Sequence, residues 1–379
     1  MKNLKKGAQV TSHKSTKACA LVFLCSCALF CGKAFCNELK FKFSPGDKYS
    51  LMLVTEQKMT RTADGNEQTF EQTTQTEWDF DIEEVDEAGF AWVKYIYRRV
   101  TMKVKSPEAN FVFDSDANKM RVPMQVMPLR LAMGEGLYLR ITPQGRIEKI
   151  NGLQALITST KAKISNVAGA DKISKAIDQQ FTESAIRRLL EDQMEIFPEP
   201  NKEGATWVRT DILSSAEAGY AKAEQIEEVN IVFERTFRLN PDKSGQSGVA
   251  VVDVNLVVKP APVFNTLPER DGQARASEQT AIPGAKANRE VSGQGAGRIE
   301  IEEATGRIIS SKMTQDTVER IKYVAQGPMR RLPQAPEPIS THMVTTFQMT
   351  RREPPVPGKV EGDKSAQPAD ANKKGAPST

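Results

Sequence analysis

Histidine is the residue type best suited to acid–base chemistry near neutral pH, and the chain has two, His13 and His342. A Ser-His-Asp triad would have to use His342, and no Gly-x-Ser-x-Gly motif is present to supply the nucleophile. His342 falls on the polar positions of an alternating segment, opposite Ile339, Met343 and Phe347. We therefore interpret it as a solvated strand residue.

Cysteine chemistry is confined to the N-terminus. All five cysteines lie within the first 36 residues, at Cys19, Cys25, Cys27, Cys31 and Cys36. If this segment is a leader that is removed, the mature protein has no disulfide, no thiolate nucleophile and no cysteine metal ligand. With one remaining histidine, sites for zinc, copper, haem and iron–sulfur clusters are not expected.

Two acidic segments have spacings that occur in functional sites. Residues 114–118, with the sequence DSDAN, have the D-x-D-x-N spacing with which an EF-hand calcium-binding loop begins. Lys119 stands where that loop needs glycine, and Gln125 stands where it needs the closing glutamate, so we interpret the segment as a polar turn. Glu83–Glu87 could pair carboxylates for acid–base work, but its alternation predicts a solvated strand end and turn.

A phosphate-binding loop is not expected either. Gly293, Gly295 and Gly297 form a glycine-rich run, but we expect this run in a mobile loop rather than between a strand and a helix. We therefore assign no catalytic, cofactor-binding or metal-binding residue, expect no cofactor, and predict that the protein is not an enzyme.

The first 36 residues have the pattern of a signal peptide. Five lysines precede the apolar run Ala18–Cys31, which is about the length of a signal-peptide core. Cleavage after Cys36 would start the mature chain at Asn37; the alternatives are lipidation at Cys27 and an uncleaved anchor. We expect an exported protein of the periplasm or cell envelope, with membrane contact only through the leader or a lipid.

Net charge does not indicate a nucleic-acid partner. The formal charge is +4, but the leader holds six lysines and no acid. Without it, 46 basic residues face 48 acidic ones, so the remaining chain is slightly acidic. We expect no nucleic acid among the partners.

The clearest element is a long hairpin over residues 67–105. Phe70, Trp78, Phe80 and Ile82 fall on even positions, with polar residues between them. A period of two places these sets on opposite faces of a sheet. The turn at residues 86–89 ends in glycine, which accepts the positive φ that such turns need.

The remaining chain reads mostly as strands around one helical segment. Residues 153–197 contain no proline and have apolar residues at helical spacing, and Pro198 follows them. This pattern predicts a helical insert over residues 153–197. We expect a mobile loop over 260–296 and a disordered tail over 353–379, where proline, glycine and charge dominate. The similar segments around Gly145-Arg146-Ile147 and Gly306-Arg307-Ile308 are interpreted as ordinary hairpins rather than a duplication.

These elements predict one domain over residues 37–352 of the α+β class. It would be a mostly antiparallel sheet, with an open half-barrel as one form of it, and the helical segment packed on one side.

The chain also resembles an uncharacterised family of exported bacterial β-rich proteins, a domain of unknown function. Four segments carry the resemblance: FKFSPGDKYSLMLVTEQKM, LYLRITPQGRIEKINGL, NKEGATW and GAGRIEIEEATGRIISSKM. The resemblance implies no catalytic residue and no ligand.

The expected function is therefore argued from architecture. A curved sheet covered by helices can hold a lipid or another apolar ligand, so a non-catalytic binding or carrier protein is the first hypothesis. The alternative is a structural or protein-interaction component of the envelope, with envelope proteins as partners. An apolar cavity would favour the first hypothesis, and a filled core the second. A buried pair of convergent carboxylates would instead indicate an enzyme.

Overall fold

The structure is a computed structural model. It describes residues 39–117, 122–124, 126–165, 169–198, 206–214, 229–240, 244, 248–261, 285–325 and 337–352. From Lys40 on, these residues belong to one unit. The predicted leader and tail, and residues 262–284 of the predicted loop, lie outside them.

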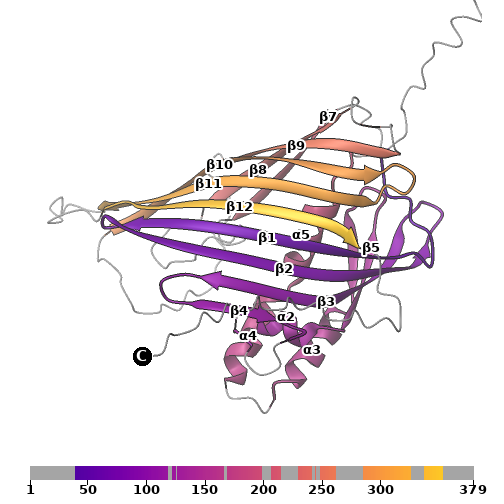
Figure 1. The fold of residues 1–379 in the computed structure, drawn as a ribbon, viewed down its shortest axis with the longest axis horizontal. Helices are drawn as coiled ribbons and strands as arrows, with labels where there is room; N and C mark the ends of the chain where they lie inside the picture. The colour runs from indigo at the N-terminus through magenta and orange to yellow at the C-terminus, as the bar shows by residue number, and fades with distance from the viewer. Residues whose placement is uncertain are drawn as a thin grey trace, which may run out of the picture. The chain divides into compact units, whose positions relative to one another are not determined.

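A 12-stranded antiparallel sheet dominates this unit (Figure 1). The strand order is β6-β5-β3-β2-β1-β12-β11-β10-β9-β8-β7, and β4 pairs with the far half of β3. The strands are β1 (Lys48–Ala63), β2 (Asn66–Val85), β3 (Ala91–Lys105), β4 (Asn110–Asp114), β5 (Gly136–Ile141), β6 (Ile147–Asn151), β7 (Thr206–Ser214), β8 (Asn230–Leu239), β9 (Val249–Pro260), β10 (Ala285–Glu302), β11 (Ile308–Ala325) and β12 (Ile339–Arg352).

The expected long hairpin is formed by β2 and β3. Trp78, Phe80 and Ile82 are at most 2% exposed, and they share one face of β2. Trp78 lies opposite Tyr97 and Phe80 opposite Tyr95 in the register. The apolar residues that alternate with polar ones in the sequence are thus buried on one face of β2, as a period of two predicts.

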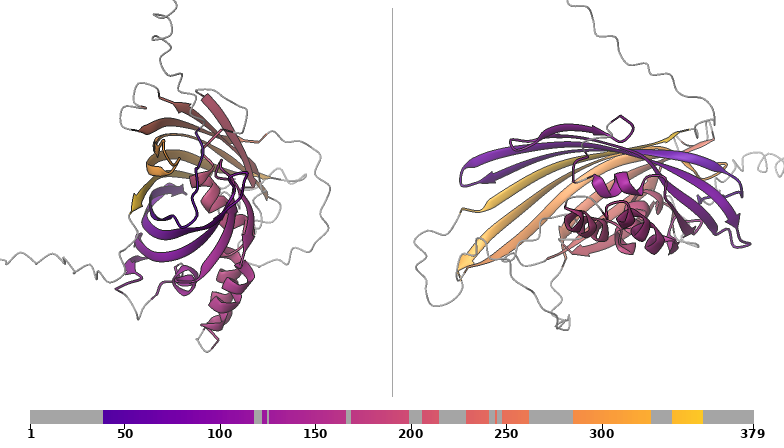
Figure 2. Two further views of the ribbon diagram at one scale, coloured as in Figure 1. Left: turned by 90° about the vertical axis from the view of Figure 1, so that its right-hand side faces the viewer. Right: turned by 90° about the horizontal axis from the view of Figure 1, so that it is seen from below.

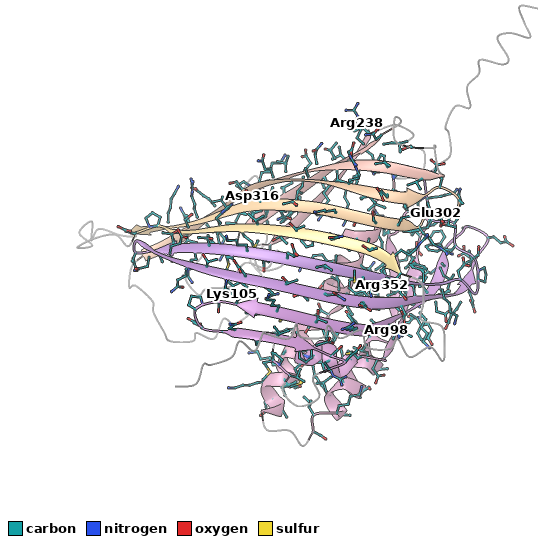
Figure 3. All side chains as sticks on the ribbon, in the orientation of Figure 1. Arg98, Lys105, Arg238, Glu302, Asp316 and Arg352 are labelled. Atoms are coloured by element: carbon teal, nitrogen blue, oxygen red, sulfur yellow. The ribbon has the colours of Figure 1, made fainter. Side chains whose placement is uncertain are left out.

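Helices lie on one side of the sheet (Figure 2). They are α2 (Met127–Ala132), α3 (Leu153–Ala162), α4 (Ala170–Gln180) and α5 (Glu183–Met194). We call this side the inner face and the other the outer face. The outer face of the central strands is mostly polar; Asp316 of β11 and Arg352 of β12 are among its side chains (Figure 3). The strand contacts of α2, α3 and α5 fall mainly on β3, β5 and β6.

The prediction of a loop over 260–296 was wrong from residue 285 onward. Residues 285–302 form β10, which pairs with β9 on one side and β11 on the other. Gly293, Gly295 and Gly297 all face inward at alternate positions. A Cβ on Gly295 would lie 2.8 Å from the carbonyl oxygen of Thr314. The glycines therefore permit close approach of two strands, and low apolar content here reflects tight sheet packing rather than a loop.

The sheet is open, because β6 and β7 at its two ends do not pair with each other. An open half-barrel stays a prediction. The segment before β1 connects two distant hairpins: Phe41 N–H donates to the carbonyl of Pro143 in the β5–β6 turn (2.7 Å), and Lys42 N–H donates to that of Thr305 in the β10–β11 turn (2.8 Å). The two similar Gly-Arg-Ile turns are thus held by consecutive residues.

Candidate functional site

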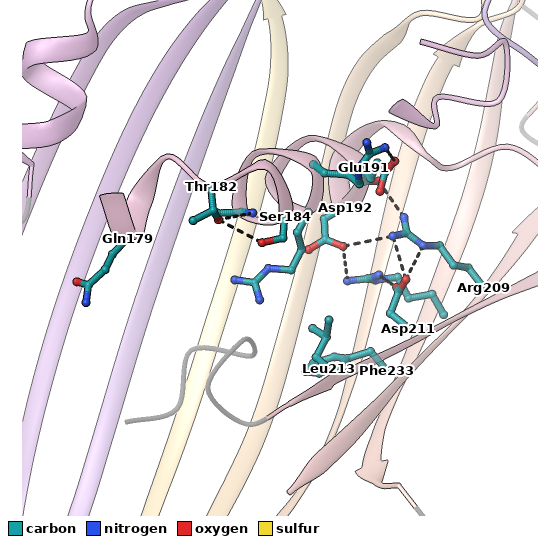
Figure 4. Close-up of a pocket in the computed structure, with 13 residues that line it drawn as sticks. Gln179, Thr182, Ser184, Glu191, Asp192, Arg209, Asp211, Leu213 and Phe233 are labelled. Atoms are coloured by element: carbon teal, nitrogen blue, oxygen red, sulfur yellow. Dashed lines mark hydrogen bonds and ion pairs between the residues drawn. The ribbon is translucent and has the colours of Figure 1, made fainter. Parts of the chain in front are cut away.

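A charged cleft lies between α5 and the strands β7 and β8 (Figure 4). It consists of a hollow of about 400 Å³ and an adjoining one of about 740 Å³, which share Glu191, Arg209 and Asp211. The first hollow is also lined by Arg187, Asp192 and Arg235 from the two sides. The second extends past Arg146 and Glu195 to the ring of Trp207.

Helix α5 presents this charge because its opposite face is apolar. Thr182 caps the helix by accepting from Ala185 N–H at 3.1 Å. Ile186, Leu190 and Met194 follow at helical spacing and are at most 2% exposed. The other face therefore carries the acidic side chains toward the strands.

Two arginines from neighbouring strands meet these acids. Arg235 Nη1 lies 2.6 Å from Asp211 Oδ2, and its Nη2 lies 3.3 Å from Asp192 Oδ1. Arg209 lies opposite Arg235 in the β7–β8 register and contacts Asp211 at 3.0 Å. Arg209 also donates to the carbonyl of Glu191 near the end of α5 at 2.9 Å. The side chains are only 12% and 18% exposed for Arg235 and Arg209, so these pairs are partly desolvated.

Glu191 connects the same helix to the other end of the sheet. Its Oε1 accepts from the N–H of Ile147 at the start of β6, at 2.9 Å. Next to it, Arg146 donates to Glu195 at 3.1 Å. Burial raises the pKa of the Glu191 carboxyl above its ordinary value, and the bond from Ile147 opposes this shift. α5 thus contacts both β6 and β7, the two terminal strands of the open sheet.

The charged side chains of this cleft form an ion-pair network. Glu191 and Glu195 are the nearest match to buried convergent carboxylates. However, the first accepts a backbone N–H and the second pairs with Arg146. Asp192 and Asp211 are each held by two guanidinium groups.

A second candidate surface is the inner face of the central strands. In the register, Met59 of β1 lies opposite Met343 of β12, and Phe347 of β12 lies opposite Met313 of β11. All four side chains are half-buried. Between these apolar rows runs a polar row that includes Gln57, whose Nε2 lies 2.8 Å from Met343 Sδ.

The residues singled out in the sequence do not gather at either surface. His342 lies on the outer face, half exposed, with Nε2 2.8 Å from Asp316 Oδ1. Asp114 and Asp116 both contact Arg99, at 2.6 and 3.5 Å. The guanidinium of Arg99 hydrogen-bonds Asp114 and holds the pKa of that carboxyl below its ordinary value.

The acidic run 83–87 ends β2 and enters its turn. Asp86 accepts from the N–H groups of Ala88 and Phe90 and pairs with Arg140 at 2.9 Å, so it serves as a turn cap. Across the residues that the structure describes, no group of three or more histidine, cysteine or acidic side chains could hold a metal ion. No helix within those same ranges is long and apolar enough to cross a membrane.

Sequence reasoning missed the charged cleft. Asp192, Arg209 and Arg235 come from one helix and two strands, and each alone has the pattern of a solvated residue. The available signal was the density of charge in α5 together with Arg209 and Asp211 at alternate positions of β7.

A family model supports the expected resemblance to an uncharacterised family over part of the chain. Residues 89–229 match a family of unknown function, DUF6263. That segment runs from the β2–β3 turn through α5 and β7. No curated protein matches the chain in sequence.

Solved structures show weak likeness. One is a lipovitellin structure whose title concerns lipid–protein interactions, at 8% identity and a TM-score of 0.40. The match covers 84% of this chain but 26% of lipovitellin, so the chain spans about a quarter of that protein. OccK8 (OprE) of Pseudomonas aeruginosa matches at 8% identity over 82% of this chain and all of its own, with a TM-score of 0.18. A DUF1329 protein of Desulfovibrio piger matches at 10% identity over 80% and 85%, with a TM-score of 0.11.

Proposed function

We propose that this is an exported, non-catalytic binding protein that carries an apolar ligand on the inner face of its central strands. The observation that carries the proposal is the half-buried apolar surface formed by Met59, Met313, Met343 and Phe347. On the same face of β2, Trp78 and Phe80 are fully buried. Beyond this sealed core, the inner face carries further apolar rows, and a polar row that includes Gln57 lies between them.

The residue types support a ligand surface. Methionine is flexible and polarizable and fits ligands of varied shape. Phe347 adds a large flat area next to Met313. Neighbouring Gln57 and Gln315 are also half-buried, and they offer amide groups to a polar end of the ligand. An acyl chain with a polar headgroup has this combination of properties.

The charged cleft has a different part in the proposal. Its arginines and acids hold α5 against β7 and β8 on one side, and Glu191 and Glu195 hold it against the β5–β6 hairpin on the other. The helix thereby fixes the spacing between the two ends of an open sheet. Because the ends of the sheet are held apart, its inner face stays open to a ligand.

The test is binding of N-phenyl-1-naphthylamine, an uncharged apolar dye that fluoresces in apolar surroundings. We expect saturable fluorescence with the protein. Phe347→Gln and Met343→Gln should each weaken dye binding by about tenfold, since losing one buried apolar contact costs roughly 1.5 kcal/mol. Val344→Gln is the matched control, because Val344 is half-buried on the outer face of the same strand.

Two results would refute the proposal: no saturable fluorescence, or equal loss in all three variants while far-UV circular dichroism stays unchanged. Export is tested separately by sequencing the N-terminus of the protein purified from its own cells. The expected first residue is Asn37, and a lipid-modified Cys27 would overturn cleavage after Cys36.

A further inference from the structure

β7 is the terminal strand of the sheet on the β8 side (Figure 1). Within the described part of the chain it pairs with β8 alone. Its outward side chains are Val208, Thr210 and Ile212, and all three are exposed. Val208 and Ile212 are 57% and 63% exposed, which is unusual for β-branched apolar residues.

The opposite end of the sheet is protected in the usual way. β6 has five residues, and Glu148, Lys149 and Asn151 are exposed along it. Short length and charged side chains keep an edge from pairing with another chain. β7 has nine residues and no charge on its outer face. Within the described residues, the β7 edge therefore has neither the short length nor the outward charges that protect β6.

The sequence of β7 is complementary to itself when reversed. Residues 207–213 read WVRTDIL. If a second copy of the strand runs antiparallel with Thr210 opposite Thr210, then Val208 lies opposite Ile212. Arg209 then lies opposite Asp211, and Trp207 lies opposite Leu213. Every position meets a residue of matching chemistry, and this holds in both directions across the two-fold axis.

We propose that two copies of this protein associate through antiparallel pairing of their β7 strands, with the two-fold axis at Thr210. The outer face gains two Val–Ile pairs, which cover the exposed side chains. The inner face gains two Arg–Asp pairs that extend the charge network of α5. The two sheets become one continuous sheet, and the contact closes on itself, so the assembly stops at a dimer.

The sharpest test is disulfide trapping in residues 37–379, which keep every residue that the structure describes and contain no cysteine. Directly opposed Cα atoms in an antiparallel pair are about 4.5–5.5 Å apart, which a disulfide can bridge. Thr210→Cys should therefore give a covalent dimer in high yield under mild oxidation. Thr210 is exposed, so the variant is expected to fold.

The register supplies matched controls. Val208→Cys should not trap a dimer, because the two copies of residue 208 would be about 13 Å apart along the strands. A mixture of the Val208→Cys and Ile212→Cys proteins should trap a heterodimer, because these positions are opposed.

Sedimentation velocity gives an independent readout. Val208→Lys and Ile212→Lys should each abolish the concentration-dependent dimer, while Val257→Lys, on the outer face of β9, should leave it intact. A monomer at all concentrations, or trapping as efficient through Val208→Cys as through Thr210→Cys, would overturn the proposal. Neither outcome bears on dye binding to the inner face.

Discussion

The β5–β6 hairpin packs against the end of α5, and we call this contact the joint between the hairpin and α5. Gly145 in the β5–β6 turn is the residue at which it can be tested most simply. It has φ of +90°, and a Cβ at this position would overlap the carbonyl oxygen of Met194 at the end of α5. Gly65 in the β1–β2 turn has φ of +72°, and no atom lies within 4 Å of its hypothetical Cβ. Gly145→Ala and Gly65→Ala therefore share the backbone penalty and differ in the overlap.

The backbone penalty is modest. A non-glycine residue in the left-handed region costs roughly 1–2 kcal/mol, and alanine recovers about 0.4–1 kcal/mol by restricting the unfolded chain. Gly65→Ala should then lower the free energy of unfolding by about 1 kcal/mol.

Gly145→Ala must also displace the end of α5. The hydrogen bond from Ile147 N–H to Glu191 lies next to this contact, and a bond to a carboxylate is worth about 1.5–3 kcal/mol. The Arg146–Glu195 pair is mostly solvated on the arginine side and adds less than about 1 kcal/mol. The expected total loss is about 3–5 kcal/mol.

Urea unfolding followed by tryptophan fluorescence measures the difference. Trp207 is a suitable reporter, because its Nε1 donates to the carbonyl of Ile196 just beyond α5, at 3.1 Å. If Gly145→Ala and Gly65→Ala lower stability by the same amount within about 0.5 kcal/mol, the proposed joint between α5 and the hairpin is refuted.

Three further predictions follow from other contacts. Burial raises the pKa of Glu191, so its contribution to stability is lost as pH rises through about 4.5 and beyond. Glu191→Gln should therefore gain stability relative to wild type between pH 4 and pH 7, and a pH-independent difference in urea unfolding would contradict this. Asp114 has the opposite sign: Arg99 lowers its pKa, so its contribution is lost as pH falls below about 3.8. Asp114→Asn should remove under about 1 kcal/mol of acid-sensitive stability, as judged from unfolding midpoints between pH 2 and 5. Gly295→Ala should lower the free energy of unfolding by roughly 1–3 kcal/mol, because its Cβ would lie 2.8 Å from the Thr314 carbonyl oxygen. A thermal unfolding midpoint equal to that of the wild type would show that β10 and β11 can separate freely.

Much of the sheet could be predicted from local sequence. Trp78, Phe80 and Ile82 alternate with acids over a long segment, and such alternation has one simple structural outcome. The helical spacing of Ile186, Leu190 and Met194 was equally plain. In both cases the information lies within one element, since a strand or helix repeats its facing residues at a fixed period.

β10 could not be recognised because its signal depends on its neighbour. Gly293, Gly295 and Gly297 lack the side chains that mark a strand, and only the close backbone of β11 explains them. The charged cleft could not be predicted from the sequence for a similar reason. Asp192 and Arg235 are far apart in sequence, and their pairing depends on how α5 crosses the strands.

The central claim is that the inner face holds an apolar ligand. Native mass spectrometry of the protein purified from its own cells tests this claim most directly. The proposal predicts a mass above that of the polypeptide, which organic extraction removes and identifies as an apolar molecule. The adduct should be reduced in Phe347→Gln and retained in Val344→Gln. A clean polypeptide mass for the wild-type protein would contradict the claim.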